Sequence, residues 1–256
     1  MTQSLDLLEN ASDSLNEALR RVGDATHLNP RPYKFAVLHF THAIELLFKH
    51  HVAQAHPLLI YRNPFSKNLA KESTIGLWDA VQFFKNEQRE LTEETLADLR
   101  WIKDLRNNIE HFKFEMDPLA ARLAIGRLIR ALNEFHEEND FTDLAGLIER
   151  DCRATYEKLA DEYKQRLFEA QRSAELANSG RDDPQTCLSC GSPKTMVAAG
   201  NKLKCHFCND ELALHECVRC TERYPEVLMR VWNDDNGRAH RDWICDFCYD
   251  HIIDHD

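Results

Sequence analysis

The fold class of this chain follows from one apolar segment at residues 33–53, which reads YKFAVLHFTHAIELLFKHHVA. Wound as an α-helix, the segment is apolar on most of its sides, and a helix of that kind is buried in a protein core. Pro57 follows it, and a proline cannot continue a helix. We therefore expect a mostly α-helical protein in which this segment is the central helix.

Amphipathic patterns lie on both sides of the central segment. Apolar residues recur at helical spacing and predict further helices at residues 4–22, 74–86, 92–114 and 118–135. Thr92 is the expected N-cap of the third of these helices, and Asp117 followed by Pro118 is expected to open the fourth. A narrow apolar stripe from Thr142 to residue 178 predicts a long last helix, which protrudes as a stalk or pairs with a second copy.

Composition and charge exclude several classes of protein. The 256 residues, 43% of them apolar, are enough for one or two domains with a core, and only 8 Gly and 8 Pro exclude collagen-like or low-complexity chains. A net charge of −11 argues against a protein that coats duplex nucleic acid through an overall basic field. The acidic N-terminus does not resemble a signal peptide, and no apolar run is long enough for a membrane span. We expect a cytoplasmic protein.

Eight of the nine cysteines form four CxxC pairs near the C-terminus. Two such pairs supply the four thiolates of a closed, tetrahedral zinc site, so the sequence predicts two structural Zn²⁺ ions that fold the segment and do no chemistry. Sequential pairing of the CxxC units is the simpler arrangement, and a cross-braced arrangement stays open. Cys152 is expected to be a buried thiol. The predicted ligands are Cys187, Cys190, Cys205, Cys208, Cys217, Cys220, Cys245 and Cys248.

These patterns predict four segments. Residues 1–140 form a helical domain, residues 141–178 the long helix, residues 179–186 a linker rich in Asn, Ser, Gly, Asp and Pro, and residues 187–256 a zinc-binding domain. The last segment resembles a small α+β or β domain of the zinc-ribbon or treble-clef type, with a hairpin turn at residues 235–237. Aromatic residues near its cysteines, among them Trp243 and Phe247, suit either a core or a surface for RNA or protein.

The segment DLRNNIEHFKF, residues 104–114, carries the residues that suggest catalysis. On a helix, Arg106 and Glu110 share one face, and Asn107 and His111 share the adjacent face. An imidazole can act as general acid or base toward a ribose 2′-hydroxyl, and a guanidinium can hold a phosphate, while Asn107 orients either group. Because one imidazole is too few for both proton transfers, we expect a homodimer in which two such faces meet.

Arg106, Asn107 and His111 match the motif of the HEPN family, and residues 1–140 resemble a HEPN domain. The segment from Ala43 to Lys49 also looks like the second helix of that family. The resemblance implies a dimeric, metal-independent ribonuclease of the toxin or defence type, with Arg106 and His111 catalytic, Asn107 assisting, and an antitoxin or regulatory protein as a further partner. Lys113 stands where a subset of the family silenced by nucleotidyltransferases has Tyr, which puts that mode of regulation in doubt.

Several alternatives stay open. Glu45 either pairs with Lys49 or faces the cleft and holds Arg106 or His111, and Arg106 could simply form a surface ion pair with Glu110. A metal bound by the histidines that precede Glu45 is disfavoured, because such positions are commonly polar edges of a core. The chain could also be a non-catalytic dimeric adaptor that presents its zinc ribbons to a protein or nucleic acid. A DNA-binding regulator is the third possibility, and the acidic C-terminal part counts against it.

Overall fold

The computed structural model describes residues 6–26, 29, 31–89, 91–111, 118–139, 141, 143–178, 183–232 and 242–253. The chain divides into two compact units, unit 1 at Met1–Lys164 and unit 2 at Gln165–Asp256. This boundary falls inside a helix, whereas the sequence predicts a linker at residues 179–186. Residues 183–186 of that segment belong to unit 2, and residues 179–182 lie outside the described part of the chain.

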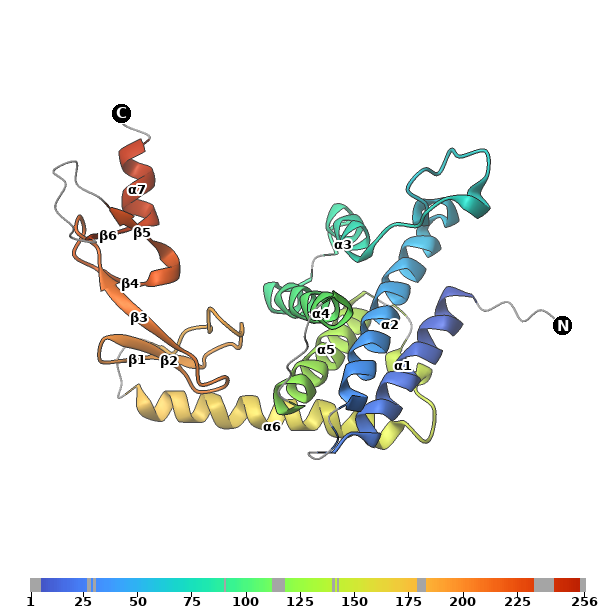
Figure 1. Cartoon of the computed structure of the whole chain (residues 1–256), viewed down its shortest axis with the longest axis horizontal. Coiled ribbons are helices and arrows are strands. Elements are labelled where there is room, and N and C mark those ends of the chain that lie inside the picture. Colours follow the sequence, from blue (N-terminus) through green and yellow to red (C-terminus); the bar gives the residue numbers. More distant parts are fainter. Residues whose placement is uncertain are drawn as a thin grey trace. The chain divides into compact units, whose positions relative to one another are not determined.

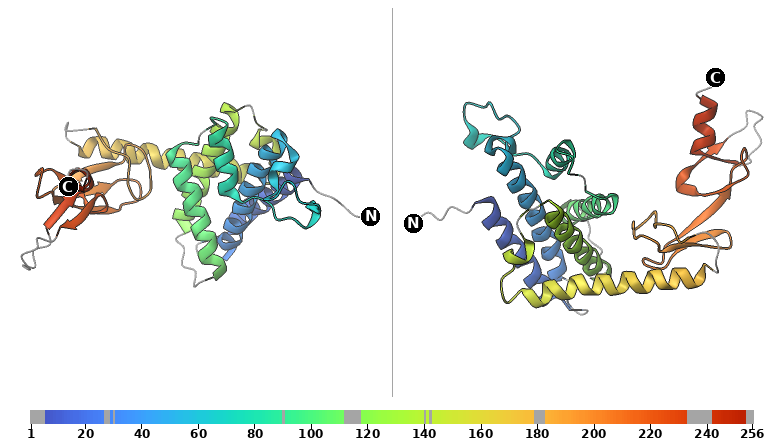
Figure 2. Two further views of the ribbon diagram at one scale, coloured as in Figure 1. Left: turned by 90° about the horizontal axis from the view of Figure 1, so that it is seen from above. Right: turned by 180° about the vertical axis from the view of Figure 1, so that it is seen from behind.

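Unit 1 is built from α-helices, as the sequence predicts (Figure 1). Its helix α2 is buried by side chains such as Phe40, Ile44 and Phe48, and α1 lies beside it (Figure 2). The apolar segment of residues 33–53 is therefore the central helix. The helices are α1 (Leu7–Asp24), α2 (Arg31–Ala55), α3 (Leu77–Asn86), α4 (Glu93–His111), α5 (Pro118–Glu138) and the first part of α6 (Arg153–Ala177), which continues into unit 2. Short 3₁₀ turns lie at Pro57–Ile60, Leu69–Lys71 and Leu144–Leu147.

Polar side chains determine where the helices start. The Asp6 carboxylate accepts a hydrogen bond from the Glu9 N–H at 2.8 Å, and the Glu9 carboxylate accepts one from the Asp6 N–H at 3.0 Å, which forms a capping box before α1. The Thr92 hydroxyl accepts a bond from the N–H three residues later, at 3.1 Å, and caps α4 as predicted. Helix α5 begins at Pro118 as expected, and Asp117 lies outside the described residues.

The long helix that was expected to begin at Thr142 begins later. Residues 144–147 form a 3₁₀ turn, and α6 starts only at Arg153, while Thr142 itself lies outside the described residues. The cause is the fully buried Asn16, whose amide donates to the Leu147 carbonyl at 2.9 Å and accepts from the Glu149 N–H at 2.8 Å. Backbone groups that bond to Asn16 are withdrawn from a helical ladder.

Helices α5 and α6 approach closely at Gly126, where an added Cβ atom would lie 2.2 Å from the Leu159 carbonyl oxygen. The next residue, Arg127, forms a buried ion pair with Asp98 of α4, with Nε 2.6 Å from Oδ2. Burial raises the pKa of Asp98 to about 7, against the opposing effect of Arg127. Breaking such a buried pair is costly, so it positions α4 against α5.

Two buried imidazoles meet between α2 and α5. Nε2 of His51 lies 3.3 Å from Nε2 of His136, and the His51 ring stacks on Phe141 with the ring centres 3.8 Å apart. Burial is the main cause that lowers the pKa of His51 to about 3, and His136 adds to it. His51 is therefore neutral in the folded protein at neutral and mildly acidic pH.

We expect His51 to make unit 1 less stable in mild acid. The unfolded chain binds a proton at this imidazole near pH 6.5 and the folded chain only near pH 3, so the free energy of unfolding falls as the pH drops below 6.5. The expected loss from this group is about 2 kcal/mol between pH 7 and pH 5. The raised pKa of Asp98 acts in the opposite direction over the same pH range, so the contribution of His51 is the difference in pH dependence between the parent protein and His51→Gln, measured by urea titrations followed by helical circular dichroism.

A matched pair of variants assigns the loss to His51. His51→Gln should remove the loss of unfolding free energy that His51 contributes between pH 7 and pH 5, because glutamine does not titrate in this range. His56→Asn should leave it unchanged, because His56 is exposed and asparagine can also accept the Leu58 N–H hydrogen bond that His56 accepts. An equal loss in both variants and in the parent protein would contradict the assignment.

Unit 2 contains a four-stranded antiparallel sheet in the order β1-β2-β3-β4 and a separate hairpin-like pair, β5 and β6. Strand β3 pairs with β2 through residues 211–213 and with β4 through residues 214–216, so a single strand joins the two cysteine-bearing parts. The predicted turn at residues 235–237 lies outside the described residues. The elements are β1 (Met196–Ala199), β2 (Lys202–Cys205), β3 (Glu211–Glu216), β4 (Arg223–Pro225), β5 (Met229–Trp232), β6 (Asp242–Cys245) and α7 (Asp246–Ile253), with a 3₁₀ turn at Glu226–Leu228.

Candidate functional site

The candidate catalytic arginine is paired with a carboxylate of the central helix. Arg106 lies on α4 with its side chain 36% exposed, and its Nη1 atom is 3.8 Å from Oε2 of Glu45 on α2. The other oxygen of Glu45, Oε1, lies 2.7 Å from Nζ of Lys49. The sequence left open whether Glu45 pairs with Lys49 or holds Arg106. In the structure it does both.

Lys49 ties this ion pair to the loop that follows α2. Its side chain is only 9% exposed, and Nζ donates a second hydrogen bond to the Thr74 hydroxyl at 3.0 Å. Thr74 in turn pairs with Tyr61 across the base of the loop. Lys49 thus fixes the position of Glu45 and, through Glu45, the position of Arg106.

His42 is a member of this cluster that sequence reasoning did not assign to it. The residue is exposed on α2, one turn before Glu45, and interacts electrostatically with Glu45 and Arg106. Partial burial lowers the pKa of His42 below its usual range, Glu45 opposes this shift and Arg106 adds to it. A neutral imidazole can accept a proton near pH 7. The available signal was the spacing of His42, Glu45 and Lys49, which places all three on one helix face.

The remaining motif residues lie on α4 beyond Arg106. Asn107 is exposed, and α4 ends at His111. The side chains of Glu110 and His111 lie outside the described part of the structure, so the predicted alternative of an ion pair between Arg106 and Glu110 is not described. The helical backbone sets Asn107 and His111 one turn apart, adjacent to the face of Arg106.

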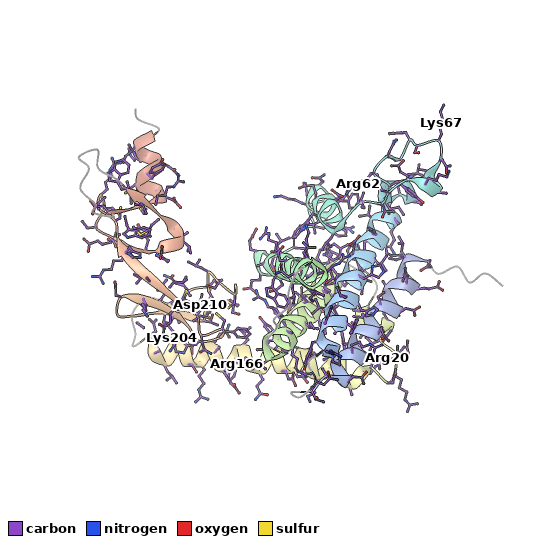
Figure 3. All side chains as sticks on the ribbon, in the orientation of Figure 1. Arg20, Arg62, Lys67, Arg166, Lys204 and Asp210 are labelled. Atoms are coloured by element: carbon purple, nitrogen blue, oxygen red, sulfur yellow. The ribbon has the colours of Figure 1, made fainter. Side chains whose placement is uncertain are left out.

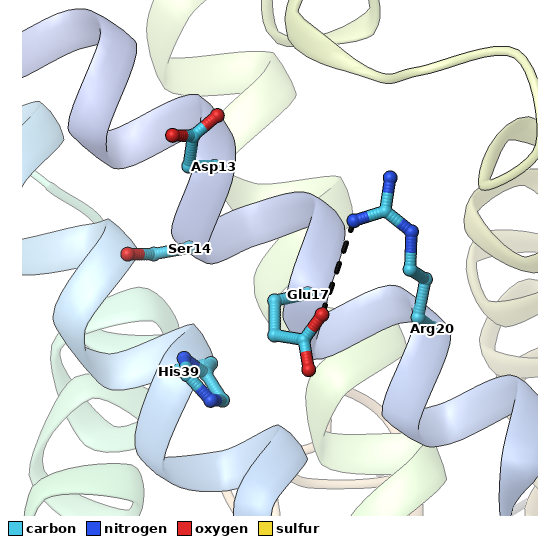
Figure 4. Close-up of a pocket in the computed structure, with 5 residues that line it drawn as sticks. All are labelled: Asp13, Ser14, Glu17, Arg20 and His39. Carbon is cyan, nitrogen blue, oxygen red and sulfur yellow. Dashed lines mark ion pairs between the residues drawn. The ribbon is translucent and has the colours of Figure 1, made fainter. Parts of the chain in front are cut away.

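A separate hollow on the surface of unit 1 lies between α1 and α2 (Figure 4). Its volume is about 340 Å³, and its lining residues are Asp13, Ser14, Glu17, Arg20 and His39. Arg20 is already paired with Glu17 at 3.9 Å, with Asp151 at 3.3 Å and with Glu149. Asp13 and Glu17 in its lining repel anions, and three carboxylates already share Arg20, so this hollow suits a phosphate poorly. We therefore place the candidate site at Arg106.

Two groups of four cysteines in unit 2 could each hold a metal ion. Within each group the four sulfur atoms lie within 4.8 Å of one another. The sulfur–sulfur distance is 3.9 Å for Cys187–Cys208 and for Cys190–Cys205, and 4.0 Å for Cys220–Cys245. A tetrahedral Zn²⁺ with Zn–S bonds of about 2.3 Å separates its sulfurs by about 3.8 Å, so both donor sets fit zinc. The groups are Cys187, Cys190, Cys205 and Cys208, and Cys217, Cys220, Cys245 and Cys248, which is the sequential pairing that the sequence favoured and not the cross-braced one.

The backbone around the cysteines is shaped to support sulfur ligands. The Cys208 N–H points at the Cys205 sulfur at 3.5 Å, and the Cys248 N–H points at the Cys245 sulfur at 3.4 Å. Such N–H donors stabilise a thiolate and orient it toward a metal. In three of the four CxxC pairs, the residue after the second cysteine turns the chain in the left-handed region: Gly191 (φ 67°), Asn209 (φ 62°) and Thr221 (φ 62°).

Most aromatic side chains near the cysteines belong to a core. Trp232, Trp243 and Tyr249 are partly buried against the second cysteine group, together with the buried Ile244. Phe247 is different, because it is 78% exposed. The structure thus assigns the three partly buried rings to packing and leaves Phe247 at the surface.

The fold and the sites define a mostly helical protein whose C-terminal sheet region carries two four-cysteine groups able to hold metal. Comparison of the chain with protein-family models, with curated proteins and with solved structures found no match. Among the described residues, no helix has the length and hydrophobicity needed to span a membrane.

Proposed function

We propose that this chain is a cytoplasmic, metal-independent endoribonuclease of the HEPN toxin or defence type. The observation that supports this most is the ion pair between Glu45 and Arg106, at 3.8 Å, which holds a half-exposed guanidinium five residues before His111 on the same helix. A guanidinium carries five N–H donors in a rigid fork, so one arginine can contact a carboxylate and a phosphate together. The resemblance to the HEPN family rests on the motif residues Arg106, Asn107 and His111.

The proposed chemistry is a transfer within the RNA chain. A neutral His111 imidazole takes the proton of a ribose 2′-hydroxyl, the 2′-oxygen forms a bond to phosphorus, and the bond from phosphorus to the 5′-oxygen breaks. A protonated imidazole gives its proton to the departing 5′-oxygen. Arg106 stabilises the charge that builds on the phosphorane, and Asn107 orients these groups. The products are a 2′,3′-cyclic phosphate and a 5′-hydroxyl, and no metal takes part.

The acid and the base have to be two different imidazoles during one turnover. A homodimer in which two α4 faces meet supplies two copies of His111 and of Arg106 in one cleft. Within one chain, the imidazole of His42 interacts electrostatically with Arg106. We therefore propose a dimer and place His42 at the edge of the same cleft.

The two structural zinc ions would fold unit 2, which then selects the RNA or binds an antitoxin or other regulatory protein. A second candidate function, a non-catalytic adaptor, is favoured by one observation in this unit. Val218 and Phe247, on the two CxxC pairs of the second cysteine group, are both exposed apolar side chains. Exposed apolar residues of this kind are common anchors in protein interfaces.

Incubation of zinc-loaded protein with total cellular RNA, without added divalent metal, tests the proposal. We expect fragments that carry 2′,3′-cyclic phosphate and 5′-hydroxyl ends. Fragments with 3′-hydroxyl ends would refute the mechanism. Binding to RNA or protein without any turnover would instead favour the adaptor.

A further inference from the structure

An ordered loop joins α2 to α3 in unit 1, and we call residues 61–74 the basic loop. Backbone hydrogen bonds close its base, from the Arg62 N–H to the Ser73 carbonyl at 3.0 Å and from the Ile75 N–H to the Ile60 carbonyl at 2.8 Å. At its tip the Asn63 side chain accepts a bond from the Phe65 N–H at 3.2 Å. The loop therefore has a defined conformation although it contributes little to the core.

The tip of the basic loop presents an aromatic ring to solvent. Phe65 is 92% exposed, more than any other large apolar side chain in the described part of the chain. Burying a phenylalanine side chain stabilises a folded protein by about 1.5–3 kcal/mol. The exposed Phe65 ring does not contribute this stabilisation. An exposed ring on an ordered loop has both faces available for stacking on a planar ligand.

Three basic residues lie in the same loop as this ring. Arg62, Lys67 and Lys71 are exposed, and Glu72 is the one acidic residue of the loop. Figure 3 labels Arg62 and Lys67. The ion pairs of the described residues include none of these three cations. The whole chain carries a charge of −11, so a locally basic loop stands out. An exposed ring and three exposed cations on one loop match a ligand that has both planar groups and negative charges.

The base of the basic loop contacts the candidate catalytic cluster. Thr74 at its base accepts the hydrogen bond from Lys49, which pairs with Glu45, and Glu45 holds Arg106. Further cations lie on α4 before Arg106. The Arg100 guanidinium and the Lys103 ammonium lie 5.8 Å and 5.6 Å from the ring centre of Trp78 on α3. Basic and aromatic side chains thus occur both in the basic loop and on α3 and α4.

We infer that the basic loop binds single-stranded RNA, with a base stacked on Phe65 and backbone phosphates held by Arg62, Lys67 and Lys71. The inference rests on the proposed function for the identity of the ligand, and it names the substrate class of that site. A paired base is already stacked in its helix and cannot reach the ring, so the loop favours single strands over duplexes. Phosphate contacts by three cations make the binding dependent on salt.

Fluorescence anisotropy with a short, labelled 2′-O-methyl RNA tests this inference on the full-length, zinc-loaded protein. The probe cannot be cleaved, because its 2′-oxygens are blocked, so binding is measured apart from catalysis. Phe65→Ala should weaken binding about tenfold, since stacking on an aromatic side chain contributes at about this level. Phe35→Ala is the matched control, because Phe35 is a 47% exposed phenylalanine on α2 of unit 1 outside the basic loop, and its binding should equal that of the parent protein.

A charge variant provides a second readout. Replacing Arg62, Lys67 and Lys71 together by Gln should reduce the slope of log K against log salt by about 2, at about 0.7 per phosphate contact on a single strand. Equal affinity for a duplex and a single strand, unchanged binding by Phe65→Ala, or no binding of the probe would each overturn the inference. If binding depends on Phe65 and no RNA is ever cleaved, the loop assignment stands and the proposed function falls. If RNA is cleaved and Phe65→Ala binds normally, the loop assignment alone falls.

Discussion

Arg106→Ala is expected to reduce the rate of RNA cleavage about a thousandfold, because it removes the charge that stabilises the phosphorane. The variant should stay folded, since the side chain is 36% exposed and Glu45 keeps its shorter ion pair with Lys49 at 2.7 Å. Single-turnover cleavage of a labelled RNA, with protein in excess, measures the chemical step apart from product release.

Arg21→Ala is the matched control for the arginine variant. Arg21 lies on α1 and is paired with Glu17, outside the ion-paired cluster of Glu45, Lys49 and Arg106, so its loss should leave the cleavage rate unchanged.

His111→Ala should reduce the cleavage rate by a factor similar to that of Arg106→Ala. The double variant should be little slower than either single variant, because the effects of groups that act in the same chemical step do not add. Unchanged cleavage by both single variants would assign any ribonuclease activity to other residues or to a contaminant.

Glu45→Gln separates positioning from catalysis within the same cluster. The amide keeps the shape of the side chain but not the charge that pairs with Arg106 and Lys49. The expected loss of rate is smaller than for Arg106→Ala, because the guanidinium is still present but less firmly held. A loss equal to that of Arg106→Ala would place the carboxylate itself in the chemistry.

Removal of zinc is expected to unfold the cysteine-bearing part of unit 2 and to leave the helices of unit 1 intact. Each half of this region has a very small core: in the first, the hydrophobic cluster around the cysteines is made by the buried residues Met196, Leu203 and Leu214. Structural zinc sites supply about 10–16 kcal/mol of apparent binding free energy at neutral pH, more than so small a core can replace. Helical circular dichroism should persist, whereas tryptophan fluorescence should change because Trp232 and Trp243 pack beside the second cysteine group.

A ligand variant gives the same result without a chelator. Cys205→Ser should lower the zinc content from two ions per chain to one, measured by mass spectrometry of the metal. Cys152→Ala is the control, because Cys152 is buried in unit 1, where its thiol donates to the Asn16 carbonyl at 3.4 Å. Equal zinc content in Cys205→Ser and the parent protein would contradict the assignment of the first group.

The sequence by itself was sufficient for the features that arise from local patterns. Periodicity predicted α2 within two residues at each end, and Thr92 and Pro118 marked the starts of α4 and α5, because caps and helix faces depend on residues a few positions apart. The CxxC spacing likewise predicted both cysteine groups, since two thiolates three residues apart can share one metal.

Tertiary structure alone decided the features that depend on residues far apart in the chain. The start of α6 was set by Asn16, which bonds to backbone groups 131 and 133 residues away, so no local pattern could reveal it. Glu45 joins Lys49 to Arg106 only because α2 and α4 pack together, and Lys49 reaches Thr74 only because the basic loop folds back on α2. Helices form from short-range periodicity and capping, whereas a buried amide or a shared carboxylate takes the partner that packing brings near it.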